Sequence, residues 1–316
     1  TKHQILNTFL NEKKMIPKIL ATSILVITIL LASALPLVAK TAEDQLGRKV
    51  QIPDDPQRVV ALAPSITEII FALGQQERLK GTTQFSNYPA GAAKLPKVGS
   101  YVRLDLERIV ALQPDLCFAI KDGNPKETIE RLQSLNIPVF AVNPRNLETM
   151  MQTIQRLGDI LNASEKAKTL VQAMRGRIQR VDALVASIEQ RPRVFIQIGI
   201  SPIISAGTNT FIHELIVRAG GINVAAGQKA YPHFSREQVL ALAPDVLIIT
   251  SMSRSGAFKK AEADWRRLIE TPAGLEKRIY TVDSDVFDRP SPRLLDALET
   301  LTRLLHPELF KDGSCI

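Results

Sequence analysis

Two segments of this 316-residue chain repeat one another, and the repeat limits the fold more than any other feature of the sequence. Residues 106–120 and 236–250 both predict a short helix, a Pro-Asp turn and an apolar run, with Glu, Ala-Leu and Pro-Asp in register. Neither apolar run alternates as a half-exposed strand would, which is typical of parallel strands covered on both faces. We therefore predict an α/β fold with two related Rossmann-like lobes and mostly parallel sheets.

Further strand and helix pairs support the duplication. Residues 58–64 and 193–198 each predict a buried strand followed by a helix. In the first of these helices, Ser65 and Glu68 have the spacing of a capping box. The sequence also predicts a short hairpin over 45–53 and a helix over 210–219. In a third internal match, the strand at 137–143 corresponds to the strand at 277–283, and the helix at 147–157 corresponds to the helix at 292–305.

A long amphipathic helix separates the two repeats. Apolar residues recur at spacings of three and four between residues 162 and 189, which is one face of a helix. Asn162 and Glu165 predict its capped start and Pro192 prevents its continuation, so the helix should be about 40 Å long. We predict an N-terminal lobe over 40–161, a linking helix over 162–190 and a C-terminal lobe over 191–316, with lobe motion limited to small rocking.

The first 39 residues have the layout of a secretory signal peptide. Lys13, Lys14 and Lys18 precede an apolar stretch over 19–39 that ends in Leu-Val-Ala, and Met15 would serve as a start. We predict export to the periplasm and a soluble mature chain from about Lys40. An uncleaved membrane anchor is the alternative, because the stretch is long enough to span a bilayer. No cysteine stands directly after the stretch, where a lipid anchor would need one, and this argues against a lipoprotein.

Charge and composition argue against several functions. The chain carries a net charge of +8, of which about +5 lies beyond residue 39, and its basic residues are scattered among acidic ones. We therefore expect no nucleic-acid partner. Only Cys117 and Cys315 are present, so neither a disulfide framework nor a metal site is predicted. Phosphate-binding loops and nucleophile elbows are absent from the sequence, which argues against an enzyme.

Aromatic residues gather in the loops that follow predicted strands, where open α/β sheets bind ligands. Few residues are aromatic, only 5% of the chain, so this grouping favours a large, flat, amphipathic ligand. The alternative is that Phe85, Phe234 and Phe287 pack under their own loops. The aromatic loops span residues 84–89, 99–101, 230–234 and 285–289.

Taken together, the motifs resemble the periplasmic vitamin B12-binding proteins and the wider class of helix-linked substrate-binding proteins of ABC importers, which includes siderophore and haem binders. The likeness extends from Arg58 to Leu305 and is carried by the strings at 58–68, 106–115, 235–240 and 284–293. It implies a monomer that binds a corrinoid in a cleft between the lobes, with no resident cofactor or metal. The ligand-binding positions implied by the likeness are Phe85, Tyr101, Tyr231, Asp285 and Arg289.

The resemblance also implies a membrane partner. Glu107 and Glu237, which coincide in the internal repeat, match the glutamates that dock into arginine pockets of the importer's two transmembrane subunits. A carboxylate can bond a guanidinium at two points, and two related lobes suit two identical subunits. The alternative is that both are ordinary first-turn residues stabilised by the helix dipole.

The sequence departs from the family at several positions. Tyr101, Tyr231 and Val286 stand where the enterobacterial vitamin B12 binder has tryptophans, and Ala219 stands where a disulfide cysteine would be. A siderophore or haem carrier is therefore a second hypothesis, for which Tyr231 and His233 are candidate iron ligands. An enzyme built on nitrogenase-like lobes is a third hypothesis.

Overall fold

The computed structural model describes residues 39–227, 229–250, 257–267 and 271–310. Residues 41–316 form one compact unit, to which the elements below belong apart from the first residues of β1. The predicted leader, except Ala39, and Cys315 lie outside the described residues. Within the described ranges, we find no helix that combines the length and the apolarity needed to cross a membrane.

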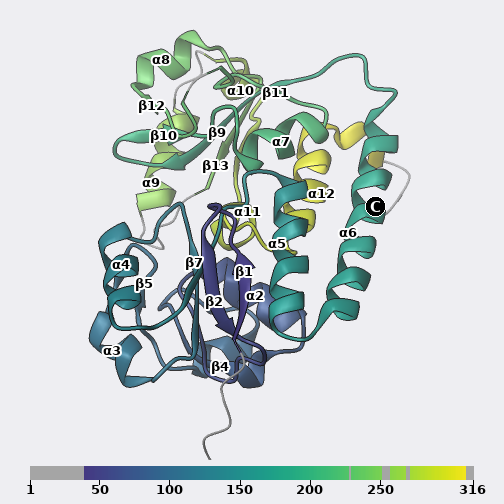
Figure 1. Cartoon of the computed structure of the whole chain (residues 1–316). Helices are drawn as coiled ribbons and strands as arrows, with labels where there is room; N and C mark the ends of the chain where they lie inside the picture. The colour runs from purple at the N-terminus through teal and green to yellow at the C-terminus, as the bar shows by residue number, and fades with distance from the viewer. Residues whose placement is uncertain (1–38, 228, 251–256, 268–270, 311–316) are drawn as a thin grey trace, which may run out of the picture. The chain divides into compact units, whose positions relative to one another are not determined.

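The first lobe is built on a four-stranded, fully parallel sheet with strand order β4-β3-β7-β8. Figure 1 labels β4 and β7 of this sheet. Its strands are β3 (Val59–Ala61), β4 (Leu79–Thr82), β7 (Leu116–Ile120) and β8 (Val139–Val142). Its helices are α2 (Pro64–Ala72), η1 (Gln76–Arg78), η2 (Ala90–Lys94), α3 (Leu106–Ala111), α4 (Lys126–Ser134) and α5 (Leu147–Ile160). Two small two-stranded sheets complete it: β1 (Ala39–Glu43) with β2 (Lys49–Pro53), and the antiparallel pair of β5 (Gly99–Ser100) with β6 (Arg103–Leu104).

Strand β7 shows why its apolar run lacks alternation. Leu116 and Phe118 belong to the hydrophobic cluster that contains α2 and α5, whereas Cys117 and Ala119 belong to the cluster that contains α3 and α4. Both faces of the strand are therefore buried, as the sequence predicts for a parallel strand.

The second lobe holds a larger sheet with strand order β12-β10-β9-β13-β14, and β11 also pairs with β9. The pairs of β9 with β11 and β13, and of β13 with β14, are parallel, whereas β10 is antiparallel to its neighbours. Its strands are β9 (Arg193–Gly199), β10 (Ile203–Ser205), β11 (Ile222–Asn223), β12 (His233–Phe234), β13 (Val246–Ile249) and β14 (Ile279–Thr281). Its helices are α7 (Phe211–Arg218), α8 (Arg236–Ala241), α9 (Ala257–Arg266), α10 (Pro272–Leu275), α11 (Ser284–Phe287), α12 (Leu294–Leu305) and η3 (Pro307–Phe310).

Helix α6 (Ser164–Val185) links the two lobes, but it is shorter than predicted. Its 22 residues make it about 33 Å long at the usual rise. The predicted cap is wrong: Ala163 is the N-cap, with no side-chain hydrogen bond, and Asn162 adopts a φ of 57°. The Asn162 amide instead donates to Asp55 Oδ1 at 2.8 Å, which removes it from the helix start.

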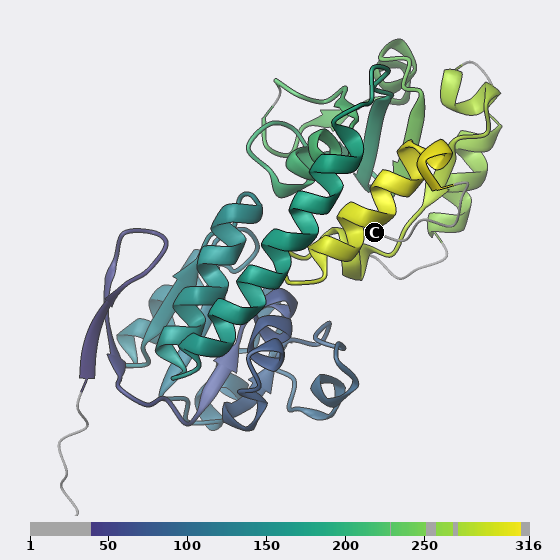
Figure 2. The same ribbon diagram turned by 90° about the vertical axis from the view of Figure 1, so that its right-hand side faces the viewer.

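Helix α6 packs on α5 of the first lobe and on α7 and α12 of the second (Figure 2). Its apolar face joins one hydrophobic cluster that contains residues of both sheets. Arg177 Nε lies 2.7 Å from Glu299 of α12 in a partly buried ion pair. Because Arg175 and Glu148 are half exposed, their ion pair at 3.1 Å contributes less. Packing thus fixes the helix to both lobes.

The predicted capping box of α2 is also wrong. Pro64 occupies the first turn and Ala63 is the N-cap, with no side-chain hydrogen bond. Proline suits this position because its missing N–H needs no partner there. Gly74, at a φ of 72°, follows the helix end as predicted. Glu68 is therefore available for contacts outside its own helix.

Candidate ligand-binding site

The five predicted ligand-binding residues lie near the ends of the strands, four of them in loops or turns and Asp285 in a short helix. Phe85 follows β4 and Tyr101 follows β5, both in the first lobe. Asp285 lies in α11, just after β14, and Arg289 follows that helix, while Tyr231 precedes β12. The sheets thus present these residues from two lobes, near the edges where α/β proteins bind ligands.

Three of the predicted residues meet in one hydrogen-bond network across the lobes. Arg289 Nη2 donates to the backbone oxygen of Phe85 at 3.0 Å and also bonds Asp285 Oδ1. Asn87 accepts from Arg289 Nη1 at 3.0 Å and donates to Asp285 Oδ2 at 2.9 Å. The Phe85 and Asp285 loops, about 200 residues apart in sequence, are thereby joined.

The two predicted tyrosines share one electrostatic environment. Burial and the charges of Asp122 and Asp288 raise the pKa of Tyr231 to about 12, and Tyr101 adds to this effect. Burial and Asp288 likewise raise the pKa of Tyr101, which Arg289 opposes. Tyr231 is nevertheless 38% exposed, so part of its ring is open to solvent. Tyr101 of the first lobe and Tyr231 of the second are therefore both under the charge of one carboxylate, Asp288.

Glu68 is a central residue that the sequence reasoning missed as a site residue. It is 4% exposed, and its carboxylate accepts from Arg289 Nη1 at 2.9 Å and from the Ser291 hydroxyl at 2.6 Å. Arg293 Nη1 lies 3.4 Å from the same carboxylate and its guanidinium stacks on the ring of Tyr88. Burial raises the pKa of Glu68, although Ser291 and both arginines oppose the shift. The sequence signal that could have identified Glu68 is its position as the acidic residue within the apolar run of α2.

Asp288 is a second missed carboxyl. Its Oδ2 accepts a short hydrogen bond from the Thr250 hydroxyl, at the end of β13. Its Oδ1 is buried and has no hydrogen-bond partner among the described residues. Burial raises its pKa to about 7, against the opposing influence of Thr250 and Arg289. A carboxyl whose pKa lies near neutral pH thus acts electrostatically on both tyrosines.

Two aromatic residues of the predicted loops serve packing. Phe287 is 3% exposed and belongs to the main hydrophobic cluster. Phe234 packs edge-on against Phe195, with ring centroids 5.3 Å apart. The packing alternative therefore describes these two rings, while Phe85 is only partly buried.

Glu107 and Glu237 occupy equivalent positions in the two lobes. Each is the second residue of its helix, α3 or α8, and each is exposed. Asp105 and Ser235 cap these helices by accepting from the backbone N–H three residues on. A hydrogen bond from Ser235, with the helix backbone, lowers the pKa of Glu237. Both carboxylates are thus presented in the same local structure.

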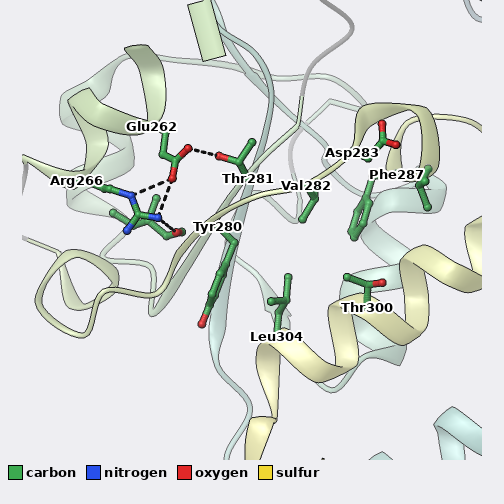
Figure 3. Close-up of a pocket in the computed structure, with 11 residues that line it drawn as sticks. Glu262, Arg266, Tyr280, Thr281, Val282, Asp283, Phe287, Thr300 and Leu304 are labelled. Atoms are coloured by element: carbon green, nitrogen blue, oxygen red, sulfur yellow. Dashed lines mark hydrogen bonds and ion pairs between the residues drawn. The ribbon is translucent and has the colours of Figure 1, made fainter. Parts of the chain in front are cut away.

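A separate pocket of about 500 Å³ lies on the second lobe, between β14, α9, α11 and α12 (Figure 3). Two of its charged groups pair with each other: Arg266 bonds Glu262 at 2.8 Å, and Glu262 also accepts from Thr281. None of the five predicted ligand-binding residues lines this pocket. We therefore place the candidate site at the strand ends. Across the described ranges, no group of three His, Cys, Asp or Glu residues could hold a metal ion.

The chain is similar in sequence to periplasmic binding proteins. The family model described as periplasmic binding protein matches residues 59–286. The vitamin B12-binding protein of Salmonella typhimurium is 33% identical over 249 residues, which cover 78% of this chain and 90% of that protein.

Two solved structures are similar over most of the chain. The periplasmic vitamin B12-binding protein of Vibrio cholerae has a TM-score of 0.72 at 29% identity, covering 82% of this chain and 100% of that chain. A periplasmic heme-binding protein from Roseiflexus also has a TM-score of 0.72, at 28% identity, covering 80% and 99%. The sequence match and the two-lobed fold with its linking helix point to the same family. The chain belongs to the periplasmic binding protein family.

Proposed function

We propose that this protein is the substrate-binding component of an ABC importer and that it captures a corrinoid between its two lobes. The observation that carries the proposal is the Phe85–Asn87–Asp285–Arg289 network that joins the two lobes, with Tyr101 and Tyr231 of opposite lobes both under the charge of Asp288, the neighbour of Arg289. Aromatic faces offer contact area to a flat ring, and the amide and charged groups suit polar substituents at its edge.

In this proposal Phe85, Tyr101 and Tyr231 contact the corrin ring. Asp285 and Arg289 bond its amide side chains. Their side chains are 17% and 9% exposed, so they border the site more than they fill it. The relatives named above as vitamin B12-binding proteins support this ligand class.

Haem is the second candidate, favoured by the heme-binding relative and by the partly exposed Tyr231. Ligation of haem iron by tyrosine uses the phenolate. Asp122 and Asp288 oppose loss of the Tyr231 proton, because negative charges near a phenol disfavour a further one. The electrostatics therefore favour the corrinoid.

The remaining parts of the proposal follow from the sequence. Residues 1–39 would direct export to the periplasm, and residues 40–161, 162–190 and 191–316 would act as first lobe, link and second lobe. The protein would act as a monomer without resident cofactor, catalytic activity or nucleic-acid partner. Glu107 and Glu237 would dock on the transmembrane subunits of the importer.

Ligand capture is tested with purified protein beginning near Lys40. After mixing with cyanocobalamin and desalting, the visible spectrum of the corrinoid should elute with the protein. Haemin is run in parallel as the competing ligand. Elution of haemin but not of cyanocobalamin would reverse the order of the two candidates, and elution of neither would overturn the proposal.

A further inference from the structure

Glu68 is a buried carboxylate whose partners come from the opposite lobe. Every residue of α2 from Pro64 to Ile70 is buried, and Glu68 is the acidic residue among them. A buried charge needs hydrogen-bonded partners to offset its lost hydration. The hydrogen-bond partners of its carboxylate, Arg289, Ser291 and Arg293, all follow α11 in the second lobe.

Arg289 is held by four acceptors at the two ends of its planar guanidinium. Nη1 donates to Glu68 and Asn87, and Nη2 donates to the Phe85 backbone oxygen and to Asp285. Three of these acceptors belong to the first lobe. Because the guanidinium is a rigid fork, these bonds fix the plane and direction of the side chain.

The charges of the cluster alternate along the lobe interface. Arg293, Glu68, Arg289 and Asp285 form a series of ion pairs at the contact between the lobes. The two acids balance the two bases. Loss of the Glu68 charge would leave the buried Arg289 with Asp285 as its partner in this series and would remove the carboxylate that Arg289 shares with the partly buried Arg293. Arg289 would then be drawn toward Asp285.

We propose that Glu68 is a positioning residue of the ligand site: by holding Arg289 across the lobe interface, it sets the orientation of the Arg289–Asp285 edge that faces the ligand. This inference rests on the proposed function wherever its test measures ligand binding. It assigns Glu68 no contact with the ligand.

The binding test compares Glu68→Gln, Arg289→Ala and the double variant by calorimetry with cyanocobalamin. Gln keeps the size of the side chain and removes its charge. We expect Glu68→Gln to weaken binding about tenfold, the loss typical of one charge-assisted hydrogen bond. The double variant should bind as Arg289→Ala does, because Glu68 acts through Arg289.

Glu214 offers a matched control. Its Oε2 accepts from the Leu147 backbone N–H at 2.6 Å, so it too joins α7 of the second lobe to α5 of the first. The Glu214→Gln variant loosens a lobe contact that involves none of the ligand-binding residues. It should lower the unfolding temperature and leave the affinity for cyanocobalamin unchanged. Equal losses of affinity in both variants would overturn the positioning role in favour of general lobe linkage.

A readout without ligand separates this inference from the proposed function. In the empty protein, Glu68→Gln should speed amide hydrogen exchange over residues 285–293, and Glu214→Gln should not. If the parent binds no cyanocobalamin, the proposed function fails and the exchange result alone decides the inference. Should Glu68→Gln not fold, Arg289→Lys replaces it, since lysine cannot bond four acceptors in one plane. If the Glu68 variant matches the parent in both cyanocobalamin affinity and amide hydrogen exchange, the proposal is overturned.

Discussion

The starts of α3 and α8 are alike in the two lobes, whereas the loops where the lobes meet are not. Asp105 and Ser235 cap the two helices, and Glu107 and Glu237 follow at the same helical position. Where the lobes meet, the first contributes the acceptors Glu68 and Asn87, and the second contributes Arg289 with its neighbours. Related lobes therefore stay alike where each would meet an identical partner, and differ where they would enclose an asymmetric ligand.

The largest effect is expected from the two glutamates that occupy the same helical position in the two lobes. Replacing Glu107 and Glu237 by Ala should strongly reduce ligand-stimulated ATP hydrolysis by the reconstituted importer. Loss of one partner of a buried interface ion pair typically costs about 2–5 kcal/mol.

Cyanocobalamin affinity of the isolated double variant is the control. It should stay within about 0.5 kcal/mol of the parent, because exposed residues away from a site are usually near neutral. Unchanged ATP hydrolysis, or lost ligand binding, would return both residues to the role of helix-terminal carboxylates.

The next effect concerns the two buried carboxyls, which differ in their partners. Both oxygens of Glu68 are hydrogen bonded, whereas Oδ1 of Asp288 has no partner in the described structure. The pKa of Asp288 rises from 3.8 to about 7 on folding. Between these pH values the folded protein keeps a proton that the unfolded chain has lost. The free energy of unfolding should therefore fall as the pH rises from about 4 to about 7.

Asp288→Asn tests this expectation, because Asn can still accept from Thr250 and carries no charge. The variant should be more stable than the parent by about 2–4 kcal/mol at pH 8 and nearly equal to it at pH 4. Urea unfolding at the two pH values measures the difference. An equal loss of stability with pH in both proteins would show that Asp288 is already ionised at low pH.

A smaller effect is expected at Tyr101 and Tyr231, which come from opposite lobes. Tyr101→Ala and Tyr231→Ala should each weaken cyanocobalamin binding by about 1–2 kcal/mol, the usual loss for an aromatic contact with a large ligand. Calorimetry on folded variants measures it. Phe234→Leu is the control, because Phe234 packs on Phe195 and should affect stability more than affinity. Parent-like binding by both tyrosine variants would show that the ligand lies elsewhere.

Patterns within short segments predicted most of the fold. The repeated helix, Pro-Asp turn and buried strand lie where expected in both lobes, because covered parallel strands have a distinct apolar pattern. Capping was predicted less well. The spacings of Ser65 with Glu68 and of Asn162 with Glu165 match capping boxes, but Pro64 at the helix start and the Asn162 contact with Asp55 override them.

The inter-lobe network could be predicted only in part. The resemblance to a known family pointed to Asp285 and Arg289, and the structure joins both to the Phe85 loop. Glu68 and Asp288 were missed because their roles depend on partners far apart in sequence. Ser291 is 223 residues from Glu68, and no local pattern encodes such a pairing.

The smallest effect tests whether the two helix starts are equivalent in energy as well as in position. Asp105 accepts from Arg108 N at 3.1 Å, and Ser235 accepts from Gln238 N at 3.2 Å. Replacing either cap by Ala should cost about 1 kcal/mol of unfolding free energy, measured by urea denaturation. The double variant should show the sum of the two losses, since the caps lie in different lobes and share no partner.

Docking should survive the loss of either cap. Ser235→Ala removes a hydrogen bond that lowers the pKa of Glu237, so this pKa should rise toward its usual value near 4.5. Carboxyls with such a pKa are still ionised at pH 7. Ligand-stimulated ATP hydrolysis should therefore stay at the parent level in Ser235→Ala and Asp105→Ala alike. If only one cap variant loses stability, or one loses importer stimulation while remaining folded, the two helix starts are not equivalent and the symmetric docking model fails.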